Sequence, residues 1–193
     1  MSATPRWRWP AWLGAGLLLA LPLGVSAADL SLLSDFGRPD IPTATLGLSA
    51  GTGAGNVAGI DQEGDANAAR IEQAGSGNHA EVWQTGSNNA ADILQRGTDN
   101  ELRLSQAFSG QLATLVQDGI GNQMAIQQLG VAADVNSSQI GDGNQLVLQQ
   151  QANSQFISTQ TGNQNQMVVD LPAGMALRVD QVGNGLSFSF HPN

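Results

Sequence analysis

Apolar and polar residues alternate through the middle of this chain in a pattern that returns every eleven residues. Glutamine marks the period. An aliphatic residue stands two positions before it, glycine usually follows two positions after it, and asparagine usually follows five positions after it. The glutamines are Gln62, Gln73, Gln84, Gln95, Gln106, Gln117, Gln128, Gln139 and Gln150; the aliphatic residues are Ile60, Ile71, Val82, Ile93, Leu104, Leu115, Ile126 and Leu148; the glycines are Gly64, Gly75, Gly86, Gly97, Gly119, Gly130 and Gly141; the asparagines are Asn67, Asn78, Asn89, Asn100, Asn122 and Asn144. Columns that stay in phase over nine periods indicate a repeat protein.

Each unit predicts one strand and one turn. It reads Asn-x-Ala-x-Ile-x-Gln-x-Gly-x-x, and its first seven residues alternate, so Asn, Ala, Ile and Gln share one face of a strand. The last four residues predict a turn, in which glycine takes a positive φ without steric cost. Two units make 22 residues, the length of one rung of a flattened β-solenoid whose rungs stack about 4.8 Å apart.

The repeat continues beyond Gln150 after two slips of the frame. One slip lies near Gln149–Gln151 and leads to Gln160, and the other lies at Leu171–Gly174 and leads to Gln181. A last alternating segment ends before Pro192. The predicted fold is therefore an all-β, amyloid-like solenoid with about thirteen strand units in six to seven rungs.

The inward columns have a simple physical interpretation. Aliphatic residues that stack on one another form a dry interior stripe. A side-chain amide carries donors and an acceptor, so a column of asparagines or glutamines can hydrogen-bond along the axis. We therefore expect the glutamine and asparagine columns to form amide ladders, because a buried amide without a partner would be costly.

The ends of the chain do not follow the frame. Residues 1–27 predict a secretory signal peptide, because Arg6 and Arg8 precede a short apolar run that ends at Gly24 and small residues lead to a cleavage site after Ala27 or Ala28. An uncleaved membrane anchor is the alternative interpretation of this segment. Residues 28–55 are expected to form a flexible targeting or linker segment, residues 56–181 the solenoid, and residues 182–193 a tail or capping strand.

Composition and charge exclude several classes of function. The formal net charge is −9, which argues against nucleic-acid binding. Cysteine is absent, so no disulfide can hold the fold. Neither His79 nor His191 has the neighbouring nucleophile that catalysis needs, so we predict no enzyme, cofactor or small-molecule substrate. We also predict no metal site: Asp118–Asn122 and Gly141–Asn144 resemble calcium-binding turns, but their aspartates do not recur at the required nine-residue spacing.

The segments Gln62–Gln73, Gln73–Gln84 and Gln84–Gln95 resemble the repeat of the curlin family, Gln-x-Gly-x-x-Asn-x-Ala-x-x-x-Gln. The run from Met175 to Gln181 is similar to the C-terminal repeat of minor curlins. This resemblance implies a subunit of extracellular functional amyloid (curli) fibres, involved in adhesion and the biofilm matrix. It implies the minor subunit, which templates polymerisation of the major curlin at the cell surface.

The resemblance also implies partners and a location. The chain would cross the outer membrane through the curli secretion pore, contact accessory proteins, and join the major curlin or further copies of itself in the extracellular fibre (fimbrium). A C-terminal rung would anchor or nucleate the fibre; it consists of Met175, Leu177, Arg178, Val179 and Gln181.

Other interpretations stay open at this point. The chain could be the major, fibre-forming curlin, or a non-amyloid solenoid that acts as an adhesin or binds ice. The outward charges, such as Asp61, Arg70, Glu72, Glu81 and Asp92, could slow premature aggregation or could simply form a solvated face. A charge-neutralised variant that aggregates no faster would remove the first of these two hypotheses.

Overall fold

The computed structural model describes the backbone of residues 45–50 and 54–192 and the side chains of residues 54–192. The expected signal peptide and most of the expected linker lie outside these residues. The described strands are β1 (Thr45–Ala50), β2 (Val57–Glu63), β3 (Ala68–Ser76), β4 (His79–Ser87), β5 (Ala90–Thr98), β6 (Glu101–Ser109), β7 (Leu112–Ile120), β8 (Gln123–Leu129), β9 (Asp134–Ile140), β10 (Gln145–Gln151), β11 (Gln155–Thr161), β12 (Gln166–Leu171), β13 (Ala176–Val182) and β14 (Ser187–Phe190).

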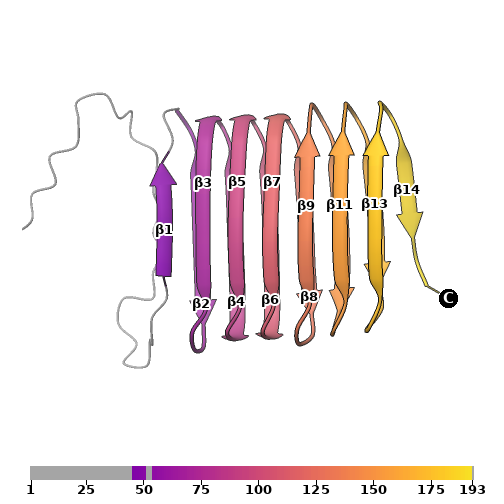
Figure 1. The fold of residues 1–193 in the computed structure, drawn as a ribbon. Helices are drawn as coiled ribbons and strands as arrows, with labels where there is room; N and C mark the ends of the chain where they lie inside the picture. Colours follow the sequence, from indigo (N-terminus) through magenta and orange to yellow (C-terminus); the bar gives the residue numbers. More distant parts are fainter. Residues whose placement is uncertain (1–44, 51–53, 193) are drawn as a thin grey trace, which may run out of the picture.

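The strands form two parallel seven-stranded sheets. The odd-numbered strands make one sheet, here the odd sheet, and the even-numbered strands make the other, the even sheet. Each odd strand and the even strand after it form one rung, and the rungs follow one another along the axis in sequence order (Figure 1). The predicted flattened β-solenoid is confirmed, and β2 to β14 are the thirteen strands expected beyond residue 56.

Turns absorb the irregularities of the sequence, so the register of the strands stays constant. Residues 22 positions apart pair from β2 to β10, as Ile71 does with Ile93. From β9 onward the spacing is 21, as between Gln139 and Gln160. The two predicted slips lie in the turns that precede β11 and β13, where each turn is one residue shorter. A shift within a strand would have turned every inward side chain outward.

One strand lies in the segment that was expected to be a linker. β1 pairs in parallel with β3, and Leu48 lies opposite Ile71 in its register. The offset is 23 residues, because the connection from β1 to β2 is longer than the later turns. The first rung therefore consists of β1 and β2.

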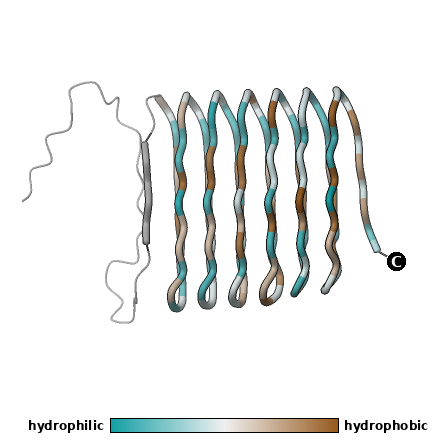
Figure 2. Tube along the Cα trace, viewed as in Figure 1, coloured by the Kyte–Doolittle hydropathy of each residue, from teal (hydrophilic) through white to brown (hydrophobic). Residues whose placement is uncertain are grey.

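The core is a narrow double column of aliphatic side chains between the sheets. Hydrophobic and hydrophilic positions recur from rung to rung along the axis (Figure 2). Ile93, Leu104 and Leu115 have no exposed surface, whereas Ile60 in the first rung is partly buried. Within the described residues, no helix could span a membrane.

Volume is conserved where the aliphatic column of the odd sheet is interrupted. Ser137 and Ser158 replace the aliphatic residue there, and their hydroxyls hydrogen-bond to each other at 2.7 Å. In the same rungs, the neighbouring inward position holds a larger side chain. Phe156 is fully buried there, whereas earlier rungs have alanine at this position, as at Ala91. A large side chain beside a small one keeps the interior close-packed.

Candidate functional site

The asparagine column of the even sheet is a continuous ladder. The side-chain nitrogen of Asn100 donates to Oδ1 of Asn78 at 2.9 Å, and Asn122 donates in the same way to Asn100 at 3.0 Å. The same Oδ1 atoms also accept the backbone N–H of the next asparagine, as Asn78 does from Asn100 at 3.2 Å. This ladder runs without interruption from Asn56 to Asn165.

Each asparagine also fixes a turn. Nδ2 of Asn100 donates to the carbonyl oxygen of Gly119 at 2.9 Å, and Nδ2 of Asn122 donates to that of Gly141 at 2.7 Å. The amide therefore binds both a neighbour in its own column and the glycine turn of the next rung. This double role explains why asparagine and glycine recur together in the repeat.

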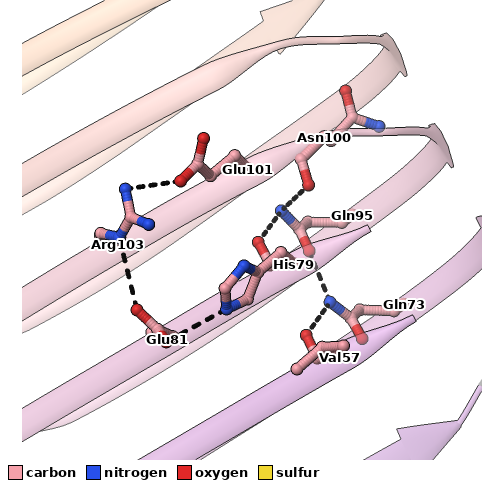
Figure 3. A network of polar contacts seen from close by, with 8 residues as sticks. All are labelled: Val57, Gln73, His79, Glu81, Gln95, Asn100, Glu101 and Arg103. Atoms are coloured by element: carbon pink, nitrogen blue, oxygen red, sulfur yellow. Dashed lines mark hydrogen bonds and ion pairs between the residues drawn. The ribbon is translucent and has the colours of Figure 1, made fainter. Parts of the chain in front are cut away.

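The glutamine column of the odd sheet runs in the opposite sense. Nε2 of Gln73 donates to Oε1 of Gln95 at 2.8 Å, so glutamines donate toward later rungs and asparagines toward earlier ones. The same Nε2 donates to the carbonyl oxygen of Val57 in the even sheet at 2.9 Å (Figure 3). Each glutamine thus joins neighbouring rungs and also joins the two sheets. The ladder continues to Gln181.

The glutamines of the even sheet form a shorter ladder of the same kind. Gln62 donates to Gln84, Gln84 to Gln106 at 2.7 Å, and Gln106 to Gln128 at 2.8 Å. The column ends after Gln150, because the next residue in register is Leu171.

The turn glycines stack backbone against backbone. Gly97 has a φ of +106°, and a Cβ atom placed on it would lie 2.0 Å from the carbonyl oxygen of Gly119. Glycine is therefore strongly favoured at such a position. Phe108 occupies the equivalent slot at a φ of +91° and is 60% exposed as a residue, so this rung holds a strained turn.

The repeated glutamine, glycine and asparagine positions also allow the sequence to be compared with known repeat families. The model of the curlin associated repeat matches residues 53–86 and 64–97. These matches support a relationship between this chain and the curlin family. Comparisons with curated proteins and with solved structures gave no match.

The amide columns lie along two edges of the solenoid that differ in regularity. The odd-to-even edge holds the turns from each odd strand to the next even strand, flanked by the glutamines of the odd sheet and the asparagines of the even sheet. The even-to-odd edge holds the other turns. Its asparagine column in the odd sheet changes after Asn89 to Gln111, Ala133, Ser154 and Met175.

Gln111 shows what is lost when glutamine replaces asparagine in this column. Its Nε2 donates to the carbonyl oxygens of Ala107, Gln128 and Gly130. Its Oε1 is buried and has no hydrogen-bond partner among the described residues. Asparagine in this slot accepts the N–H of the next rung, as Asn89 does from Gln111 at 3.1 Å. The longer side chain turns its oxygen away from that donor.

A second ladder on the odd-to-even edge was not predicted from the sequence. Oδ1 of Asp142 accepts the N–H of Ile120 at 3.0 Å, and Oδ1 of Asn163 accepts that of Asp142 at 2.9 Å. Asn184 continues it with the N–H of Asn163 at 2.7 Å. The ladder spans only three later rungs, so it gives too short a repeat to stand out in the sequence.

The outward face of the first rungs holds exposed charges in pairs. Glu81 contacts Nε2 of His79 at 3.1 Å and Nε of Arg103 at 3.3 Å, and Arg103 also contacts Glu101 (Figure 3). Arg70 pairs with Glu72 and Asp92 on the odd sheet. Exposed pairs of this kind contribute little stability. In the described part of the chain, no cluster of three or more side chains is suited to hold a metal ion.

The residues of the expected C-terminal anchoring rung all lie in or just before β13. Val179 and Gln181 are buried, Leu177 is partly buried, and Arg178 is exposed and pairs with Asp180 at 2.9 Å. Met175 is in the asparagine register but is 36% exposed. Gln181 is thus the only amide of this set, and it accepts from Gln160 at 2.8 Å.

Proposed function

We propose that this chain is a structural subunit of extracellular curli-type amyloid fibres and that its solenoid templates the folding of a major curlin at the cell surface. The observation that carries this proposal is the pair of continuous amide columns along the odd-to-even edge. Parallel strands that stack identical side chains in register are the arrangement of cross-β fibres. The curlin repeat match supports the same conclusion.

Templating follows from the terminal strands. The outermost strand of each sheet carries a row of N–H and C=O groups that can pair with another chain. An incoming curlin strand would pair with this row and continue the inward asparagine, aliphatic and glutamine columns. The columns would fix the register, because a shift of one residue would place amides outside and charges inside. The template thereby removes the slow step of forming a first rung, whose contacts are distant in sequence.

The remaining parts of the chain take roles that the family implies. Residues 1–27 direct export, and residues 28–55 carry the segment that the outer-membrane curli pore and its accessory proteins recognise. Arg178 and its neighbours in β13 contact the machinery at the cell surface. The finished fibre serves adhesion and the biofilm matrix.

A seeding assay tests the proposal. A trace of this chain, diluted from denaturant, is added to a purified major curlin, and fibre formation is followed with an amyloid dye. We expect a shortened lag together with slow fibre formation by the chain alone. No seeding and no dye signal would refute the proposal and leave a monomeric solenoid adhesin.

A fibre-forming major subunit is the second candidate, and the continuity of the columns favours it as well. Six of the rungs have asparagine in the even sheet, the pattern that copies stacked in one fibre would share. Rapid fibre formation by the chain alone, at a rate equal to that of a major curlin, would select this role.

A further inference from the structure

The two ends of the solenoid differ in the side chains they offer to another rung. We propose that only the β1–β2 end templates, and that the β13–β14 rung terminates the amide columns and does not extend the fibre. This inference rests on the proposed function and specifies which end of the chain performs it.

The asparagine ladder has a direction, and this direction makes the ends unequal. In each rung, Oδ1 accepts the N–H of the next rung, as Asn144 does from Asn165 at 3.1 Å. A rung added after an existing one therefore needs an Oδ1 acceptor beneath it. A rung added before Asn56 must instead bring an acceptor of its own to the N–H of Asn56.

The β13–β14 rung lacks that acceptor. The N–H of Leu186 still donates to Oδ1 of Asn165 at 3.0 Å, so Leu186 occupies the asparagine slot. Its own side chain offers nothing to a following rung. Met175 fills the asparagine slot of the odd sheet in the same rung and is equally unable to accept.

The rest of this rung also ends the pattern. In the glutamine column of the even sheet, Leu171 replaces glutamine one rung earlier. Pro192 is the next residue in this column, and it has no N–H to donate. β14 is only four residues long, and short strands are a common way to blunt a sheet edge. Phe188 and Phe190 pack against the core and are partly buried, so they close the apolar interior. Gln181 still continues the glutamine ladder of the odd sheet, and Asn184 continues the short ladder of turn residues.

The β1–β2 rung presents the two even-sheet amide columns that the β13–β14 rung has lost. Asn56 is buried and occupies the first position of the unbroken asparagine column, and Gln62 begins the glutamine column of the even sheet. A partner whose last rung carries asparagine and glutamine would match both residues. A second copy of this chain would instead place Leu186 and Pro192 there. The chain therefore favours a different curlin as its neighbour over another copy of itself.

Restoring the missing acceptors tests this inference. The double variant Leu186→Asn with Met175→Asn should assemble without a partner, with a lag at least about tenfold shorter than that of the wild type, because each restored slot satisfies a buried donor. The matched control is Ser187→Asn with Ala176→Asn, which adds the same amides at exposed positions next to the two slots. Equal acceleration in both variants, or none in either, would overturn the inference.

A second measurement uses the unaltered chain. Gold-labelled wild-type chain is used to seed the major curlin, and the positions of label along single fibres are recorded by electron microscopy. We expect label at one end only, and label that is equally frequent inside fibres would contradict the inference. A chain that fails to seed would refute the proposed function instead. The self-assembly comparison of the two double variants would then still test whether the two ends differ.

Discussion

The two edges of this solenoid carry the same repeat but tolerate different sequences. Along the odd-to-even edge, asparagine continues from Asn56 to Asn165 and glutamine from Gln73 to Gln181. Along the even-to-odd edge, both columns lapse, the strained Phe108 replaces a glycine, and both predicted slips occur. One continuous pair of ladders is therefore enough to hold the rungs in register, and the opposite edge can drift in sequence.

The largest effect is expected from breaking the regular edge at its centre. Asn122→Ala removes the acceptor of two hydrogen bonds from Asn144 and the donor to the carbonyl of Gly141. Because these groups are buried, the free energy of unfolding should fall by about 3 kcal/mol or more. Unfolding in guanidinium chloride, followed by circular dichroism, measures this change in the free energy of unfolding.

The matched change on the other edge is Ser154→Ala. Ser154 occupies the asparagine register there and makes one side-chain hydrogen bond, to the carbonyl oxygen of Gln151. The loss should be about 1 kcal/mol. Equal losses for Asn122→Ala and Ser154→Ala would show that the two edges do not differ.

Two glycines sharpen the same comparison at the turns. A Cβ atom on Gly97 would lie 2.0 Å from a backbone oxygen, whereas one on Gly110, at a φ of +69°, would meet nothing within 4 Å. Gly97→Ala should therefore cost more than about 2 kcal/mol, and Gly110→Ala about 1 kcal/mol from backbone strain alone. Thermal unfolding of both variants measures the difference, and the reverse ranking would contradict the stacked-turn geometry.

Removing the strain at Phe108 should stabilise the irregular edge. Phe108→Gly supplies the residue that the equivalent turns carry, and Phe108 is mostly exposed. The expected gain is about 1 to 2 kcal/mol in the free energy of unfolding. Phe108→Ala keeps a Cβ atom at the same positive φ and serves as the control. If it stabilises as much as glycine, the strain is not the cause.

The smallest expected effect comes from Gln111→Asn. Oε1 of Gln111 is buried without a partner among the described residues, and the shorter side chain would bring its oxygen to the N–H of Ala133. We expect a gain of about 1 kcal/mol. Faster amide hydrogen exchange at Ala133 in the variant than in the wild type would contradict this geometry.

Much of the fold follows from the sequence, because every inward column repeats at a fixed spacing. The period of eleven predicts the strands, the turns and the 22-residue rung, and the shift to Gln160 predicts a slip. Strand β1 was not predicted, because Leu46 and Leu48 alternate without any flanking glutamine or asparagine in the frame. Alternation over so few residues is too weak a signal by itself.

The details of the ladders need the structure. Sequence spacing shows that amides stack, but it does not show that asparagines donate toward earlier rungs and glutamines toward later ones. That direction depends on where each side-chain oxygen lies relative to backbone N–H groups. For the same reason the unpartnered oxygen of Gln111 could not be predicted, although the residue fits the column by type.

The account depends most on the claim that the amide columns at the first rung are the templating surface. The direct test is seeding of a major curlin by the variant Asn56→Asp with Gln62→Leu, compared with the wild type and with the outward control Asp61→Asn. Aspartate removes the Nδ2 donor that Asn56 would direct to an added rung. Leucine, which this glutamine column already holds at Leu171, removes the Oε1 acceptor that Gln62 would offer. We predict that the double variant remains folded and seeds at least about tenfold less well, while the control seeds normally. A folded double variant that seeds as well as the wild type would contradict the claim.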